Sequence, residues 1–124
     1  MKIPKTTTIK ASRSTSEPVL TLSGFWLARF GFEIGTPVSI YELNGFLILK
    51  LRGVRSEYDS FLSTKFPKDS YVVSRPIKNT FMPQLTLTGN QLENYGFNIG
   101  NHVLINVKWG FIYLKHCPKD SLMF

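Results

Sequence analysis

The sequence predicts a mainly β protein with short helices, built from two internal repeats. Three observations support this: a repeated segment, an alternation of apolar and polar residues within it, and a turn dipeptide before its last strand. Shifting the chain by 65 positions aligns residues 18–50 with residues 83–115 without a gap. Sixteen of the 33 aligned positions are identical, whereas about two would be expected from average composition. The chain therefore contains a duplication.

Each copy begins with a strand followed by a short helix. Residues 20–23 read Leu-Thr-Leu-Ser, which is the alternation of a half-buried strand. Ser23 or Gly24 can start a helix over residues 25–30, and Gly31 suits the left-handed position that ends it. The second copy repeats this plan, with its helix over residues 90–95.

A β-hairpin completes each copy. Residues 38–42 alternate again, and Asn44-Gly45 is the dipeptide that best supports a tight type I′ turn before a returning strand over residues 46–51. The second copy repeats the hairpin around Trp109-Gly110, although Trp109 is a poor residue for that turn.

One copy alone encloses too little interior to be stable, so the two copies should bury their apolar faces against each other. We expect one domain over residues 1–124, with repeats at about 5–51 and 67–117 joined by a connector, 52–66. The expected core residues combine apolar character with the strand or helix phase. They are Leu20, Leu22, Leu27, Phe32, Ile34, Val38, Ile40, Leu49 and their partners 65 positions later.

Two further features lie outside the aligned copies. A weaker similarity pairs residues 9–13 with residues 71–75, so that each copy would start with a basic extended segment ending in Ser-Arg. Between the copies we expect a short helix near residues 57–62, a turn over residues 67–70 and a strand at residues 71–73.

Composition limits the classes of partner. The net charge is +7 and the isoelectric point is near 9.7, a balance that favours polyanions such as nucleic acid. Cys117 is the only cysteine and no secretory signal is visible, so we expect a cytoplasmic protein, with association to the nucleoid left open. No apolar run approaches the roughly 20 residues that cross a bilayer, and no membrane partner is expected.

The basic residues are concentrated outside the aligned copies, which carry a net charge of +1 against +6 for the rest of the chain. This distribution predicts a surface that contacts phosphates, centred on the N-terminal arm and the connector. The alternative is that these charges only keep the protein soluble and its strand edges unpaired. The candidate phosphate-contacting residues are Lys10, Arg13, Arg29, Lys50, Arg52, Arg55, Arg75 and Lys78.

Aromatic residues near these charges could stack on unpaired bases. The candidates are Phe25, Trp26 and Trp109. Packing in the core is the favoured alternative for Trp26, because it neighbours Leu27 on the expected helix.

The sequence assigns no catalytic residue, and whether the chain is an enzyme stays open. His102 replaces Pro37 of the first copy, and His116 precedes Cys117, but no acidic residue is near in sequence to orient either imidazole. No cluster has the spacing of metal ligands and no glycine-rich loop could hold phosphates, so no cofactor or metal is expected.

The order of motifs in the first copy resembles the SymE family of small bacterial toxins. The matching positions are Pro18, Leu20, Leu22, Gly24, Trp26, Leu27, Gly31, Phe32, Gly35 and the hairpin over residues 38–51. The second copy has Asn90-Gln91 in place of Phe25-Trp26 and is a diverged relative of the motif. SymE proteins are similar in turn to the AbrB and MazE class.

The resemblance implies a swapped-hairpin β-barrel of the AbrB type, made from two units that this chain would supply itself as an intramolecular pseudo-dimer. A further homodimer stays open. It also implies a nucleic-acid-binding protein of toxin–antitoxin character that binds DNA or RNA. Two alternatives remain: an endoribonuclease toxin that cleaves RNA, and a protein-interaction module resembling an antitoxin or immunity protein.

Overall fold

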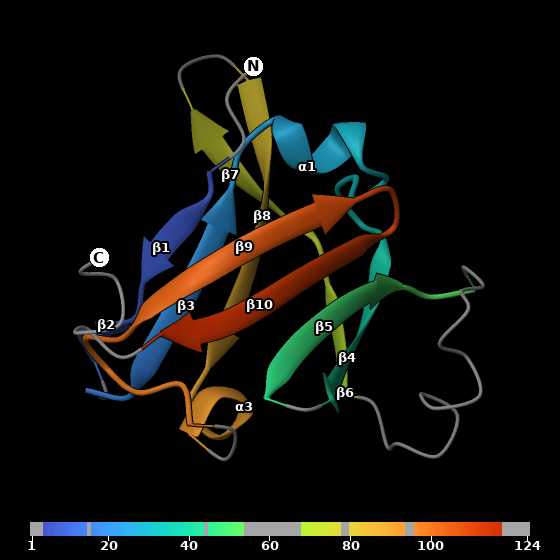
Figure 1. Cartoon of the computed structure of the whole chain (residues 1–124). Coiled ribbons are helices and arrows are strands. Elements are labelled where there is room, and N and C mark those ends of the chain that lie inside the picture. The colour runs from blue at the N-terminus through green and yellow to red at the C-terminus, as the bar shows by residue number, and fades with distance from the viewer. Residues whose placement is uncertain are drawn as a thin grey trace.

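The computed structural model describes residues 4–14, 16–43, 45–53, 68–77, 80–93 and 96–117. Strands dominate, and the two helices of this part are four residues long, which confirms a mainly β chain with short helices (Figure 1). In chain order the elements are β1 (Thr6–Thr8), β2 (Lys10–Ala11), β3 (Pro18–Ser23), α1 (Trp26–Arg29), β4 (Pro37–Leu43), β5 (Phe46–Leu51), β6 (Lys68–Tyr71), β7 (Val73–Ile77), β8 (Thr80–Thr88), α3 (Asn90–Glu93), β9 (His102–Lys108) and β10 (Phe111–Cys117).

Two predictions for the region between the copies have different outcomes. The helix expected near residues 57–62 lies outside the described residues. The turn expected over residues 67–70 is wrong, because β6 occupies Lys68–Tyr71 and pairs with β4. No helix in the described part of the chain is long and apolar enough to span a membrane.

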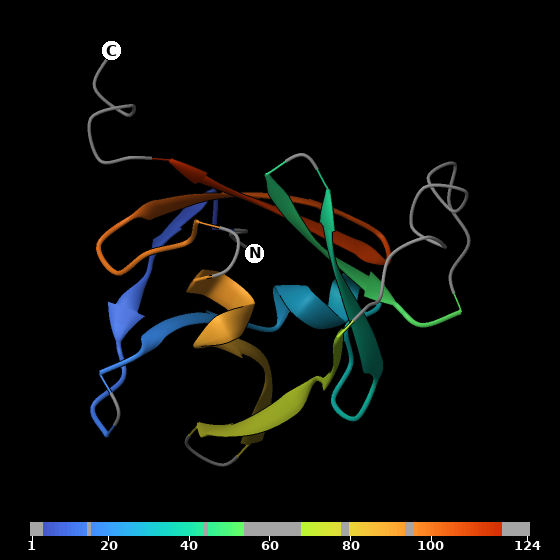
Figure 2. The ribbon, with the colours of Figure 1, turned by 90° about the horizontal axis from the view of Figure 1, so that it is seen from below.

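The strands form two sheets. The larger has the order β1-β9-β10-β5-β4-β6, and the smaller has the order β2-β3-β8-β7. The helices α1 and α3 lie at opposite ends of the molecule in Figure 1 and within the outline of the strands in Figure 2. The described strands do not close into one barrel, because β1 and β6 are the edges of the larger sheet and β2 and β7 are the edges of the smaller one.

Strands from both copies meet in the middle of each sheet. In the smaller sheet β3 pairs with β8, and Thr21 lies opposite Thr86. In the larger sheet β5 pairs with β10, and Ile48 lies opposite Tyr113. Each of these residues faces its own equivalent 65 positions away, which is the pattern of a twofold contact between identical surfaces. A pseudo-twofold axis therefore relates the two copies.

The segments before each copy are exchanged between the copies. β1 belongs to the arm of the first copy but pairs with β9, and β6 precedes the second copy but pairs with β4. Between β1 and β2 the chain passes from one sheet to the other at Ile9, whose N–H donates to the Asn101 carbonyl at 3.1 Å. Val72 makes the same passage between β6 and β7, and its N–H donates to the Thr36 carbonyl at 3.1 Å. Both side chains are 1% exposed.

These hydrogen bonds correct the predicted alignment of residues 9–13 with 71–75. Ile9 is the structural equivalent of Val72, so the true offset in the arms is 63 positions, one more than the sequence match suggested. The physical reason is burial: the residue that turns between the sheets must be apolar, and Val72 fills that place.

The core forms between the sheets much as predicted. All the expected core residues are buried except Ile34 and Ile99, which are 48% and 50% exposed. Each of these lies at the second position of a four-residue turn, closed by a bond from the Thr36 N–H to the Glu33 carbonyl in the first copy and by the equivalent bond in the second. A side chain at the corner of such a turn points away from the protein, and the prediction for these two residues is wrong.

Candidate nucleic-acid interface

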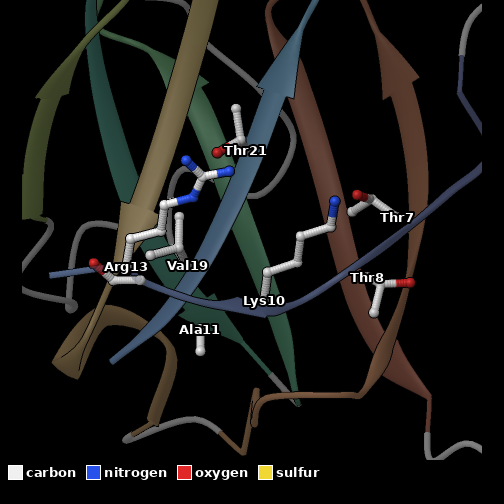
Figure 3. Close-up of a pocket in the computed structure, with 8 residues that line it drawn as sticks. Thr7, Thr8, Lys10, Ala11, Arg13, Val19 and Thr21 are labelled. Carbon is white, nitrogen blue, oxygen red and sulfur yellow. The ribbon is translucent and has the colours of Figure 1, made fainter. Parts of the chain in front are cut away.

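Lys10 and Arg13 line one groove at the edge of the smaller sheet. The groove has a volume of about 430 Å³. Figure 3 shows both side chains extending from the arm in the same direction along β3. The described lining residues are Thr7, Thr8, Lys10, Ala11, Ser12, Arg13, Val19 and Thr21. None of them is acidic, so two cations and several hydroxyl groups share a groove without a carboxylate among these side chains.

The short strand β2 and the turn after it place the two cations. Lys10 pairs with Val19 of β3, and the chain then turns, with the Ser12 N–H donating to the Glu17 carbonyl at 2.7 Å. Arg13 lies inside this turn and is exposed. The turn is closed from its other end by the Ser16 N–H, which donates to the Ser12 carbonyl at 3.0 Å. The turn therefore brings Arg13 back toward β3, the strand with which Lys10 pairs.

The second copy does not repeat this groove. Val73 stands at the position of Lys10, and Ser74 stands at the position of Ala11. Beyond Ser74 the strand β7 continues to Ile77, so no turn corresponds to the one that carries Arg13. The two cations are therefore a feature of one half of the pseudo-symmetric molecule.

The structure does not bring Arg75 to this groove. Arg75 lies on β7, and β3 and β8 separate that strand from β2. Three strand intervals correspond to about 14 Å in the plane of a sheet. The strand that carries Arg75 is therefore the edge of the sheet opposite to the strand that carries Lys10. Lys78 and Arg55 lie outside the described residues.

Arg29, Lys50 and Arg52 are also distant from the groove. Arg29 is an exposed residue in the last turn of α1, and Arg52 is exposed directly after β5. Both lie at the same end of the molecule, because Gly110 bridges the end of α1 and the end of β5 by hydrogen bonds. The Gly110 N–H donates to the Phe30 carbonyl at 2.8 Å, and the Gly110 carbonyl accepts from the Leu51 N–H at 3.0 Å. β1 pairs with the opposite end of β9, about 20 Å away at the usual rise of a strand.

The three aromatic candidates have different environments. Trp26 is only 3% exposed, and its indole N–H donates to the Ser23 carbonyl at 3.1 Å, so the packing interpretation describes it. Phe25 and Trp109 are exposed. One side of the Trp109 ring lies close to Gly31, and the residue sits in the β9–β10 turn.

The two histidines lie on opposite faces of the larger sheet. His116 is registered with the buried Val103, and its ring packs edge-on against Phe97 with centroids 4.9 Å apart. His102 lies at the next register position, opposite Cys117, and its Nδ1 is 3.5 Å from Thr8 Oγ1. The two imidazoles cannot act on one substrate atom. The described residues also contain no group of three or more metal-ligating side chains.

Sequence reasoning missed a second surface with basic and aromatic residues. Phe46 and Lys50 recur as Phe111 and Lys115 in the second copy. The four residues occupy alternate positions of β5 and β10, whereas the intervening leucines Leu47, Leu49 and Leu114 are in the core. The repeated spacing was a visible signal, but assigning it to an exposed face required the pairing of β5 with β10.

Comparisons with models of protein families, with curated proteins and with solved structures find no significant match for this chain.

Proposed function

We propose that this protein binds nucleic acid through phosphate contacts made by Lys10 and Arg13. The observation that carries the proposal is the convergence of these two side chains on one groove whose described lining contains no acidic residue. The guanidinium of Arg13 can bind two phosphate oxygens at once, and the ammonium of Lys10 supplies a compact charge beside it.

The remaining groups of the groove suit the same role. Thr7, Thr8, Ser12 and Thr21 offer hydroxyl groups that can donate to phosphate oxygens. Contacts of this kind position a nucleic acid without reading its bases. The groove is therefore proposed to bind DNA or RNA with little sequence preference.

The proposal extends to the family of the protein. We propose that the chain is a SymE-like protein whose two copies form an AbrB-type swapped-hairpin arrangement within one polypeptide. The exchanged arms and the pairing of β5 with β10 support this proposal. It predicts slowed growth of a bacterial host on induced expression, and unimpaired growth at full expression would contradict the toxin character.

A salt titration tests the groove. Fluorescence anisotropy with labelled duplex DNA and duplex RNA measures affinity as the salt concentration increases. The double variant Lys10→Ala/Arg13→Ala should bind more weakly than the wild type. Its plot of log affinity against log salt should also be shallower, by about one unit for each phosphate that the variant no longer neutralises.

The control removes the same charge elsewhere. Arg29→Ala/Arg52→Ala also loses two positive charges, but at the other end of the molecule. We expect this variant to keep most of the wild-type affinity and slope. Equal weakening by both double variants would mean that overall charge, and not the groove, drives binding. Wild-type affinity that does not fall with added salt would contradict phosphate contacts.

A further inference from the structure

The outward face of the larger sheet carries an aromatic cluster that is separate from the core. Ile48 and Phe111 are buried within it at 4% and 5% exposure, and Tyr41, Phe46 and Tyr113 pack around them with part of their surface exposed. These residues belong to β4, β5 and β10. The register sets Tyr41 beside Ile48, and Ile48 beside Tyr113, so the cluster runs across the centre of the sheet. We call it the aromatic face.

Lysine side chains lie over these rings. The Lys108 Nζ is 5.5 Å from the centroid of the Phe111 ring and 5.8 Å from that of the Tyr113 ring. The Lys115 Nζ is 5.6 Å from the centroid of the Phe46 ring. These distances are those of cation–π contacts. The ammonium groups therefore lie near the rings, while both lysine residues remain exposed to solvent.

The acidic residues of the neighbouring strands lie away from these rings: Glu42 of β4 is registered opposite the core residue Leu47, and Asp69 is on the edge strand β6. β5, β9 and β10 hold Lys50, Lys108 and Lys115 and no acidic residue. Lys50 is registered opposite Phe111, and Lys115 opposite Phe46, so a lysine and an aromatic residue alternate on both sides of the pseudo-twofold axis. A surface of this composition attracts an anion that also has flat apolar rings.

A shallow pocket of about 330 Å³ opens on this face. Phe46, Asn106, Lys108 and Tyr113 line it. The two rings offer stacking surfaces, and the amide of Asn106 offers both a donor and an acceptor to the edge of a base. Both helices lie on the inner side of the larger sheet, and no described element covers its outer side (Figures 1 and 2).

The copies differ at the equivalent positions. Tyr41 replaces Asn106, Leu43 replaces Lys108 and Ile48 replaces Tyr113 in the first copy. The pocket lined by Asn106 and Lys108 therefore lies on one half of the aromatic face only.

From these observations we infer that the aromatic face binds single-stranded nucleic acid. Unpaired bases stack on Phe46 and Tyr113, Asn106 bonds to a base edge, and Lys108 and Lys115 contact the phosphates. Stacking on exposed aromatic side chains with nearby cations is how many proteins hold single strands, because every base has a flat face. A duplex hides those faces and should not use this surface.

A second copy of the chain fits this face less well. Packing two aromatic faces together would bring Lys108 and Lys115 of each copy against those of the other, and neither β9 nor β10 contains an acidic residue. Juxtaposed like charges oppose such a contact. The inference also stands apart from the groove of Lys10 and Arg13, which lies at the edge of the other sheet.

Affinity for labelled oligothymidylate of about 12 nucleotides, near the length that one small domain covers, tests the inference. Phe46→Leu and Tyr113→Leu keep apolar bulk but remove the stacking ring, and each should weaken binding of the single strand by about tenfold. Duplex affinity should change by less than about twofold. Phe81→Leu is the matched control, because Phe81 is an exposed aromatic residue on β8.

Ultraviolet crosslinking supplies a second readout that does not depend on the variants. Oligothymidylate crosslinked to the wild-type protein and digested with trypsin should label the peptides spanning residues 30–50 and 109–115, which contain Phe46 and Tyr113. Labels confined to peptides of the N-terminal arm would overturn the inference.

The outcomes separate this inference from the proposed groove. Single-strand affinity that is unchanged in Phe46→Leu and Tyr113→Leu overturns the role of the aromatic face, even if Lys10→Ala/Arg13→Ala abolishes duplex binding. If Phe46→Leu and Tyr113→Leu lose single-strand binding, the role of the aromatic face is supported. If Lys10→Ala/Arg13→Ala leaves duplex binding unchanged, the proposed groove is rejected. A protein that dimerises through this face and binds no single strand also overturns the inference.

Discussion

Gly31 and Gly35 show what single residues contribute to this fold. Both have a positive φ, +93° and +89°, a conformation that side chains other than glycine rarely adopt. Their surroundings differ, however. A Cβ atom at Gly31 would lie 2.6 Å from Leu51 Cδ1 and 3.1 Å from the Trp109 ring, whereas a Cβ at Gly35 would meet nothing within 4 Å. The first glycine is needed for backbone conformation and for packing, and the second for conformation alone.

Alanine substitutions should separate these two contributions. Gly31→Ala should lower the free energy of unfolding by about 2–4 kcal/mol, because backbone strain adds to overpacking. Gly35→Ala should lower it by about 1 kcal/mol, from strain alone. Urea unfolding followed by circular dichroism measures both. Equal losses in the two variants would show that the close approach of Gly31 to Leu51 and Trp109 contributes nothing.

Residue identity also explains how the second hairpin tolerates Trp109. A type I′ turn requires positive φ at both central residues. In the β9–β10 turn only Gly110 has a positive φ, and Trp109 does not. The sequence correctly located this turn but assumed the wrong geometry for it.

At the scale of the elements, the exchanged arms connect the copies. The N-terminal arm crosses between the sheets at Ile9, which is buried beside residues of the second copy. Terminal segments often contribute little to stability unless they are fixed in this way. The burial of Ile9 implies that the arm is part of the core.

Ile9→Ala tests that conclusion. Removing this buried side chain should lower the free energy of unfolding by about 2–5 kcal/mol, as for an interior position. Lys5→Ala, an exposed change in the same arm, should alter stability by less than about 0.5 kcal/mol. Urea denaturation of both variants is the measurement. A small loss for Ile9→Ala would mean that the arm is detached in solution.

At the scale of the whole molecule, each of the two sheets contains strands from both copies. β3 needs β8 and β5 needs β10 as neighbours, so the separation of the copies would break both sheets at their centres. Shared sheets of this kind should make the unfolding of the two copies one event.

The two tryptophans allow this cooperativity to be measured, since Trp26 belongs to the first copy and Trp109 to the second. Trp109→Phe and Trp26→Phe each leave one fluorescent reporter. In each variant the urea midpoint from fluorescence should coincide with the midpoint from far-ultraviolet circular dichroism. Distinct midpoints, or two transitions in either variant, would show that the copies unfold independently.

The amino-acid sequence was sufficient to predict the repeat, the positions of the hairpins and nearly all of the core. Each of these depends on spacing along the chain. Leu20 and Leu22 alternate with polar residues, and Asn44-Gly45 favours a turn whatever part of the fold the hairpin contacts. Ile34 misled the prediction because its exposure depends on a turn that apolar character does not reveal.

Which charges and rings share a surface was visible only in the folded chain. Lys10 and Arg13 line one groove, whereas Arg75 lies on β7, the opposite edge strand of the same sheet. Phe46 meets Lys115 only because β5 pairs with β10. The physical reason is that these pairings join strands distant in sequence, and a local pattern specifies which residues of a strand share a face without specifying the strand that lies beside it.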